Sequence, residues 1–399
     1  MKVLSLFDGM SVAQQALKNL GIKVDTYYAS EVDPYAIAVT QSNFPDTIQL
    51  GDVEEVGKSM CNNCFDGDNH LCCVEECMYG KNIDILIGGS PCQDLSIAKK
   101  NREGLKGERS GLFWEYVRIR DKVKPKYFIL ENVASMPKEA RDTISEALGV
   151  EPVMINASLV SAQNRKRLFW VGKWNGESYE QVEIPQPEDR GILLKNILEE
   201  NVDEKYYVDT KKLNKDIRAS ENSSFDYYNN KEVPNNKAKV LGTNPQSTTA
   251  VAGQLVRVGS LNSGGQGDRI YSKEGKSVAL SANGGGRGAK TGLYEVSGAA
   301  SRTYPRTKIS GQTRSKQIEI RDDGKANAMT SVQGDSMVAQ ETQIRKLTPT
   351  ECLRLQSMPD NFFDKAEYKG KPISNTQRYK MCGNAFNCEV VSHIIKHLI

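Results

Sequence analysis

A cysteine stands at a position suited to nucleophilic chemistry. Cys92 lies in the run Gly-Gly-Ser-Pro-Cys-Gln of residues 88–93, directly after the apolar residues 83–87. This pattern predicts a buried strand that ends in a tight loop. Open α/β sheets carry out their chemistry at the carboxyl ends of their strands, and a thiolate is a strong nucleophile even at low ionisation. The sequence therefore predicts that Cys92 attacks a substrate covalently.

A carboxyl group follows another strand-like segment. Residues 127–130 form a short apolar run that ends at Glu131-Asn132-Val133. If this strand lies in the same sheet, the Glu131 carboxyl shares a pocket with Cys92. Partial burial there favours its protonated form and allows it to donate a proton. The alternative is an acid that only caps the next helix.

Two arginines precede a further strand, predicted at residues 168–171. In the run Gln163-Asn164-Arg165-Lys166-Arg167, extended backbone would point Arg165 and Arg167 to the same side. Paired guanidinium groups suit phosphates and carbonyl oxygens. The alternative is a solvated basic turn.

The first strand, residues 2–6, leads into Phe7-Asp8-Gly9-Met10-Ser11. Gly9 allows a ligand to approach the backbone, and the helix that follows offers free N–H groups. Glu31 ends the second strand about 22 residues later, where an acid binds ribose hydroxyls in nucleoside-binding sheets, and Asp52 after the third strand could bind an adenine amine. Because the loop lacks G-x-G-x-x-G, a nucleoside without diphosphate, such as S-adenosylmethionine, is the predicted ligand.

A cysteine cluster lies in a hydrophilic insertion, residues 57–82. Two close groups of cysteines can supply four thiolates to one tetrahedral zinc ion. The predicted ligands are Cys61, Cys64, Cys72 and Cys77, with His70 as a spare candidate. The alternative is a loop of reduced thiols without metal.

Strand-like and helix-like segments alternate along residues 1–172, which predicts a doubly wound, mostly parallel, Rossmann-like α/β sheet. Residues 175–342 are rich in glycine, serine and asparagine, and short β-hairpins are their predicted structure; a disordered linker is the alternative. Helical signals return near residue 348. We therefore expect a catalytic domain made of residues 1–174 and 343–399, interrupted by a smaller β-rich domain at 175–342.

Composition limits the setting of the protein. The 399 residues carry a net charge of +3 and only three histidines, so histidine-centred catalysis is not expected. No apolar run reaches the roughly 18 residues of a membrane span, and the N-terminus is unlike a signal peptide. We expect a cytoplasmic protein without membrane contact.

Together these motifs resemble the DNA (cytosine-5) methyltransferases. The matching stretches occur in the order of that family and cover both flanks, residues 1–172 and 343–399, which are similar to bacterial and phage enzymes and to the mammalian de novo type. They are Phe7-Asp8-Gly9, Glu31, Asp52, residues 89–93, residues 131–133, residues 163–167 and Gly383-Asn384-Ala385. Two departures, Ser11 where many members have a second glycine and Asp8 in place of a small residue, are expected to matter little.

The resemblance implies a mechanism. The target cytosine leaves the DNA stack, Cys92 adds to C6, and Glu131 hydrogen-bonds N3 and the exocyclic amine. C5 then takes the methyl group of S-adenosylmethionine, a base removes the C5 proton, and Cys92 is expelled. Arg165 and Arg167 would hold the cytosine carbonyl and the DNA backbone.

The implied cofactor contacts extend the set found from the residues alone. They are Phe7, Asp8, Gly9, Met10, Ser11, Glu31, Val32, Asp52, Val53, Pro91, Leu112, Asn384 and Ala385. The implied partner is double-stranded DNA, bound by a monomer and recognised through residues 175–342, with a cognate restriction endonuclease as a further candidate partner. A tRNA cytosine-5 methyltransferase and a non-catalytic DNA-binding relative are the alternatives.

Overall fold

The computed structural model describes residues 1–57, 83–91, 110–207, 223–226, 231–234, 255, 257–260, 269–273, 275–280, 292–295, 301–304, 315–318 and 344–399. The chain divides into two compact units. One comprises Met1–Ile192, Ala279–Ala282 and Pro349–Ile399, and the other comprises Leu193–Val278 and Asn283–Thr348.

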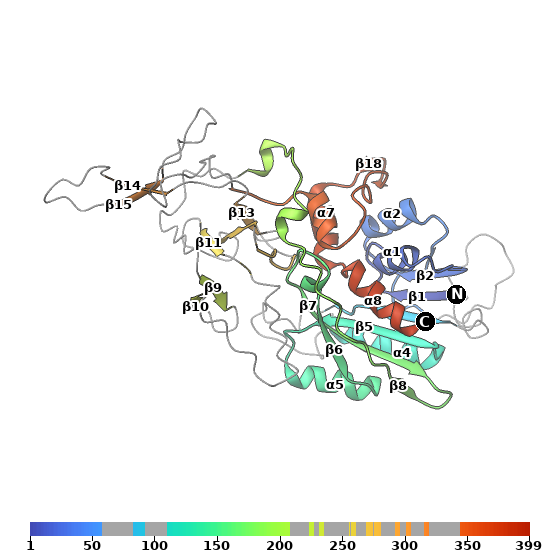
Figure 1. Cartoon of the computed structure of the whole chain (residues 1–399). Coiled ribbons are helices and arrows are strands. Elements are labelled where there is room, and N and C mark those ends of the chain that lie inside the picture. Colours follow the sequence, from blue (N-terminus) through green and yellow to red (C-terminus); the bar gives the residue numbers. More distant parts are fainter. Residues whose placement is uncertain are drawn as a thin grey trace. The chain divides into compact units, whose positions relative to one another are not determined.

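An eight-stranded sheet forms the centre of the first unit (Figure 1). Its strands are β1 (Lys2–Leu6), β2 (Thr26–Ser30), β3 (Ile48–Gln49), β4 (Ile85–Gly88), β5 (Tyr127–Val133), β6 (Pro152–Asn156), β7 (Lys166–Trp174) and β8 (Tyr179–Gln181). The order is β3-β2-β1-β4-β5-β7-β6, with β8 paired to β7. The first five strands pair in parallel, whereas β7 runs antiparallel to β5, β6 and β8. The expected doubly wound, mostly parallel fold is confirmed.

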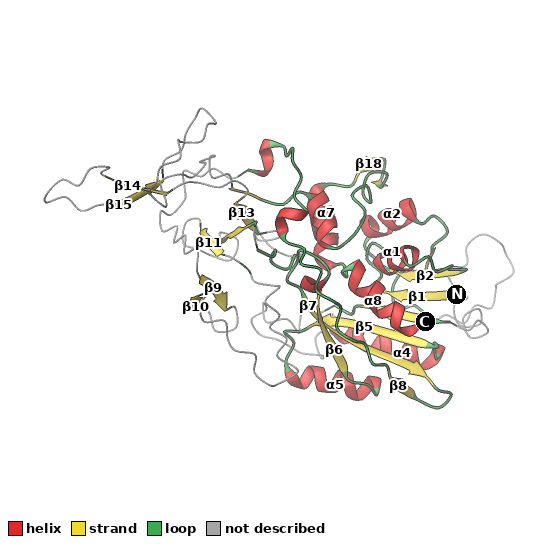
Figure 2. Cartoon of the chain, in the orientation of Figure 1, coloured by secondary structure: helices red, strands yellow, loops and turns green. Residues whose placement is uncertain are grey.

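Helices join and cover these strands (Figure 2). They are α1 (Val12–Asn19), α2 (Pro34–Asn43), α4 (Phe113–Val123), α5 (Lys138–Leu148), α6 (Pro349–Leu355), α7 (Asn375–Asn384) and α8 (Cys388–Leu398), with short 3-10 turns η2 (Ser110–Leu112) and η3 (Ala157–Leu159) and a small ribbon of β17 (Glu367–Tyr368) and β18 (Lys371–Pro372). Four consecutive residues of β1 and all four of β4 are buried, so both faces of the sheet are covered.

Apolar packing places the strand ends. Leu4 and Leu6 of β1, Leu86 of β4 and Phe128 and Leu130 of β5 belong to one core cluster with side chains of α4 and α5. Because alternate residues of a strand face opposite sides, this cluster fixes which residues point to the other face. The core thus holds β4, β5 and β7 in register, with their functional ends at one edge.

The described residues of the second unit form mainly short strands. A four-stranded sheet has the order β11-β12-β13-β16, and two separate ribbons pair β9 with β10 and β14 with β15. The strands are β9 (Ser223–Asp226), β10 (Lys231–Pro234), β11 (Arg257–Ser260), β12 (Arg269–Ser272), β13 (Leu293–Glu295), β14 (Ser301–Tyr304), β15 (Ser315–Ile318) and β16 (Ile344–Arg345); the turns are η4 (Leu194–Asn196) and η5 (Glu204–Tyr206).

The boundaries between the units fall later in the chain than the sequence places them. Residues 175–192 stay with the first unit because β8 extends the large sheet beside β7. At the other end, β16 pairs with β13, so residues up to Thr348 stay with the second unit. Within the described part of the chain, no helix is both long and apolar enough to span a membrane.

Candidate active site

The loop after β4 lies beside the end of β5. The Asn132 side-chain amide donates to the Ser90 carbonyl at 3.3 Å and to the Ser90 hydroxyl at 3.2 Å. A Cβ atom on Gly89 would lie 3.0 Å from a carboxylate oxygen of Glu131 and 2.7 Å from the ring of Phe386. Only glycine fits at that approach, and the loop therefore runs directly against the Glu131 carboxylate. The structure describes this loop as far as Pro91. Cys92 lies outside the described residues, so its role stays a prediction.

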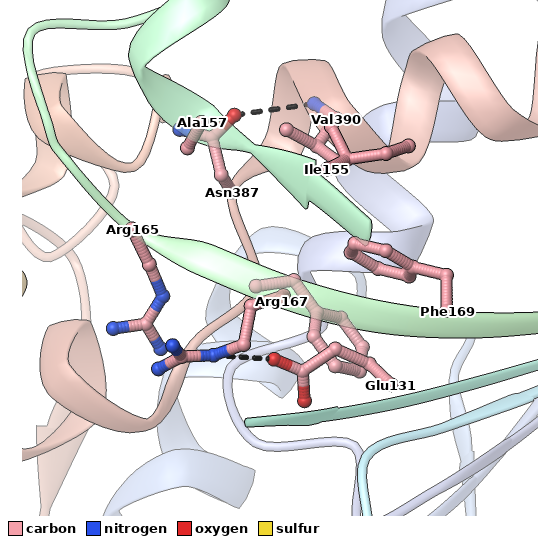
Figure 3. A pocket seen from close by; sticks show the side chains of 9 residues that line it. Glu131, Ile155, Ala157, Arg165, Arg167, Phe169, Asn387 and Val390 are labelled. Carbon is pink, nitrogen blue, oxygen red and sulfur yellow. Dashed lines mark hydrogen bonds and ion pairs between the residues drawn. The ribbon is translucent and has the colours of Figure 1, made fainter. Parts of the chain in front are cut away.

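Glu131 and Arg167 form an ion pair at this edge (Figure 3). Arg167 Nε donates to Glu131 Oε1 at 2.7 Å, and the two side chains are 19% and 13% exposed. The pair follows from strand register, because Arg167 on β7 stands opposite Val133 on β5, two residues beyond Glu131. Both side chains line a small pocket. The site thus presents an acceptor and a donor next to each other.

Arg165 lines the same pocket but has other partners. Arg165 is 3% exposed, and its guanidinium donates to the carbonyls of Leu280, Gly383 and Ala385 at 3.2, 3.1 and 2.9 Å. Arg165 therefore ties the start of β7 to the end of α7. These contacts fit a positioning residue better than one that holds a substrate carbonyl.

The residues after α7 close the pocket on another side. Asn387 caps α8 by accepting from the Val390 N–H at 3.1 Å, and its amide donates to the Leu355 carbonyl at 3.0 Å. Asn387 and Phe386 both line the pocket with Glu131. Sequence analysis did not single out Phe386, because an aromatic residue after a Gly-Asn-Ala run carries no signal until its contact with Gly89 is known.

The predicted cofactor loop is fixed by Glu31. One carboxylate oxygen accepts from the Gly9 N–H at 2.8 Å, and the other accepts from the N–H groups of Val32 and Asp33, both at 2.8 Å. Gly9 has φ +60°, a left-handed conformation that favours glycine. The side chain of Val32 is 65% exposed beside this carboxylate. An exposed apolar side chain next to a carboxylate suits a nucleoside, which has an apolar ring and a ribose with hydroxyl donors.

A buried polar network lies under the same loop. The Asp8 carboxylate accepts from the Tyr27 hydroxyl at 2.8 Å and from the Ser11 hydroxyl, and Thr40 in turn donates to Ser11 at 3.2 Å. Burial, aided by the negative charge of Glu31, raises the pKa of Asp8 to about 6, although its hydroxyl donors oppose the shift. The Asp8 side chain thus forms hydrogen bonds with buried hydroxyl groups beneath the loop.

The other residues implied as cofactor contacts fall into two groups. Exposed or half-buried ones remain accessible to a ligand, namely Phe7, Asp52, Pro91, Leu112 and Asn384. Buried ones are Met10, Val53 and Ala385. Asp52 also accepts from the Glu54 N–H at 3.0 Å and so begins a turn.

The predicted zinc ligands, Cys61, Cys64, Cys72 and Cys77, lie outside the described residues, as does His70. Among the residues that the structure does describe, no group of three or more His, Cys, Asp or Glu side chains could hold a metal ion. The zinc site therefore stays a prediction.

The fold and this strand-edge site define a Rossmann-like methyltransferase. The family model of the C-5 cytosine-specific DNA methylases matches residues 1–399, and the chain belongs to that family. This confirms the sequence-based identification of a DNA cytosine-5 methyltransferase.

Similar sequences include a phage protein and a bacterial protein. The chain is 27% identical over 475 residues to the orphan methyltransferase M.SPRI of Bacillus phage SPR, covering 100% of this chain and 97% of the relative. It is 25% identical over 404 residues to the type II methyltransferase M.HhaI of Haemophilus parahaemolyticus, covering 99% and 93%. Among solved structures, S. pombe Dnmt2 methyltransferase has a TM-score of 0.55 at 14% identity, with 100% of this chain and 98% of that chain covered. This structural likeness shows a shared fold.

Proposed function

We propose that the enzyme methylates C5 of a cytosine flipped out of duplex DNA, with Cys92 as the nucleophile and S-adenosylmethionine as the methyl donor. The observation that carries the proposal is the Glu131–Arg167 pair beside the loop that leads to Cys92. Family membership and the printed names of the phage and bacterial relatives support DNA as the substrate.

The pair matches one edge of cytosine. Along its Watson–Crick edge, cytosine presents a carbonyl oxygen, then N3, then an amine. A guanidinium beside a carboxyl group offers a donor for the carbonyl and a partner for N3 and the amine. We assign Arg167 to the carbonyl and Glu131 to N3 and the amine, where it neutralises charge as the Cys92 sulfur bonds to C6 and the ring becomes an enamine.

The later steps methylate C5 and release Cys92 as a free thiolate. C5 of the enamine bonds to the methyl group as the bond between that group and the donor sulfur breaks, which releases S-adenosylhomocysteine. A base then removes the C5 proton, and the C5–C6 double bond reforms as the bond between C6 and the Cys92 sulfur breaks. S-adenosylmethionine supplies the electrophilic methyl group when bound. The accessible Val32 and the Glu31–Gly9 contact support its binding between the first two strand ends.

The second unit is proposed to read the DNA sequence. Its short strands and the basic side chains of residues 193–348 fit groove and phosphate contacts. A monomer on DNA, a cognate restriction endonuclease and action in the cytoplasm remain predictions.

The experiment measures transfer of a radiolabelled methyl group from S-adenosylmethionine to phage-genome DNA and to bulk tRNA. We expect transfer to DNA, its loss in Cys92→Ser, and a loss of about 10²–10⁴-fold in Glu131→Gln, as for other lost acid catalysts. Two variants serve as controls, Glu139→Gln at an exposed position on α5 and Cys388→Ser at a cysteine on α8, and both should retain transfer.

The alternatives predict different outcomes. Transfer to tRNA and none to DNA would identify a tRNA methyltransferase. DNA binding without transfer to either nucleic acid would identify a non-catalytic relative. Full activity in Cys92→Ser would remove the proposed covalent mechanism.

A further inference from the structure

The two departures from the family motif in the first loop touch each other. Asp8 and Ser11 are 6% and 0% exposed, and the Ser11 hydroxyl donates to the Asp8 carboxylate. The Tyr27 hydroxyl donates to the other carboxylate oxygen at 2.8 Å. Both departures therefore belong to one buried network.

The backbone at Ser11 needs this support. Ser11 has φ 55° and ψ 45°, in the left-handed region that glycine adopts freely and other L-residues adopt at a cost. Phe7 and Gly9 are left-handed as well, with φ 56° and 60°, so the loop turns sharply at alternate residues. A serine that replaces glycine at such a position must be held there by its side chain.

The Ser11 side chain is held on two sides. It donates to Asp8 of its own loop and accepts from Thr40 of α2 at 3.2 Å. Asp8 itself is fixed through its backbone, because its N–H donates to the Ser30 carbonyl at 3.1 Å and its carbonyl accepts from the Ser11 N–H at 3.2 Å. The Asp8 carboxylate thus sits at the centre of the contacts that shape the loop.

We propose that Asp8, Ser11 and Tyr27 act together as positioning residues for cofactor binding, in which the Asp8 carboxylate holds Ser11 in the conformation that a glycine would otherwise supply. This inference rests on the proposed binding of S-adenosylmethionine at the Gly9 loop. None of the three side chains needs to touch the ligand. They set the backbone that presents the Gly9 region to it.

The hydrogen-bond network of Asp8, Ser11 and Tyr27 should respond to pH. A carboxylate accepts charge-assisted hydrogen bonds from both hydroxyls, whereas a protonated carboxyl is neutral and carries its own O–H donor, so these bonds lose the strength that the charge gives them. The ionisable groups that face Asp8 are Tyr27 and Glu31. Burial raises the pKa of Tyr27 well above its usual range, so Tyr27 stays neutral near pH 6. Cofactor affinity should therefore fall as the pH drops below about 6, where Asp8 takes up a proton.

The test is a double-mutant cycle on the purified full chain, with S-adenosylhomocysteine binding measured by calorimetry and thermal unfolding measured without ligand. Asp8→Ala should weaken binding by about five- to thirtyfold, the cost of a left-handed non-glycine residue. In the Ser11→Gly background the same substitution should cost less than threefold. Equal effects of Asp8→Ala in both backgrounds would overturn the proposal.

A second pair of variants keeps the test decisive if Asp8→Ala does not fold. Ser11→Ala keeps the strained conformation and loses the hydroxyl, so it should bind S-adenosylhomocysteine at least fivefold more weakly than Ser11→Gly. Equal affinities of the two variants would refute the proposal that Asp8 holds Ser11 in place. Asp8→Asn should remove the fall in affinity below pH 6 that the wild type shows, because Glu31 is unchanged between the two proteins.

The failure of the proposed function would be distinguishable. If the wild type binds no S-adenosylhomocysteine, the assigned cofactor is wrong. The unfolding temperatures still report the coupling between Asp8 and Ser11 without ligand. Additive shifts of the unfolding temperature in the double mutant would by themselves overturn the proposal that Asp8 holds Ser11 in place.

Discussion

Replacing Arg165 tests whether this arginine positions the site or contacts the substrate. Arg165 is buried and donates to three backbone carbonyls. Hydrogen bonds from a charged group stabilise by about 1.5–3 kcal/mol each, and their contributions overlap when one side chain makes all of them. We therefore expect Arg165→Ala to lower the free energy of unfolding by about 3–5 kcal/mol, a loss typical of a broken buried charged network.

The assay is urea unfolding followed by tryptophan fluorescence, beside methyl transfer at low urea. With a slope of about 3 kcal/mol per molar urea, the midpoint should fall by roughly 1 M or more. Arg141→Ala is the matched control, because Arg141 lies at the surface beside Asp142 and both are about half exposed. Its midpoint should stay within roughly 0.2 M of the wild type, since exposed pairs contribute little.

One result would refute this reasoning. If Arg165→Ala unfolds at the wild-type midpoint and loses methyl transfer, Arg165 acts on the substrate and the carbonyl contacts are incidental. Arg165→Lys separates the roles further, because a lysine keeps the charge but loses the fork, in which Nη1 reaches the Leu280 carbonyl while Nη2 reaches those of Gly383 and Ala385.

Three further predictions concern other parts of the chain. Because burial raises the pKa of Asp8 from 3.8 to about 6, the wild type should lose about 3 kcal/mol of stability relative to Asp8→Asn as the pH rises from about 3 to about 7. Urea unfolding across that range measures the loss, and parallel curves would contradict the assigned burial. Elemental analysis should find about one zinc per chain, lost on replacing Cys61 and Cys64 together, and a metal-free active enzyme would end that prediction. Exchanging residues 193–278 and 283–348 with those of a relative of different specificity should transfer the methylated sequence, as mapped by bisulfite sequencing. An active hybrid that keeps the original site would place specificity in the first unit.

Strand and helix positions near the sheet centre were predictable because local patterns determine them. The apolar runs at β1, β4 and β5 sit between glycine, proline or acidic residues, and α8 has an apolar stripe that continues for its whole length. α7 was missed, since its buried residues, Met381, Cys382 and Gly383, gather at one end and form no stripe.

The pairing of site residues could not be predicted in the same way. Glu131 meets Arg167 only because β7 enters the sheet antiparallel to β5, and no local pattern carries that direction. The carbonyls that bind Arg165 from α7 belong to residues 218 and 220 positions further along the chain. Sequence spacing drew attention to the two arginines, but their different partners depend on long-range contacts.

The most direct test of the central claim is trapping of the covalent intermediate. DNA made with 5-fluorocytosine in place of cytosine is incubated with the enzyme and S-adenosylmethionine, and denatured complexes are separated and mapped by mass spectrometry. Because fluorine at C5 cannot leave as a proton does, the adduct should persist. We predict one DNA adduct, on Cys92, absent without cofactor and absent from Cys92→Ser. An enzyme that methylates ordinary DNA but forms no adduct, or forms it on another residue, would contradict the account.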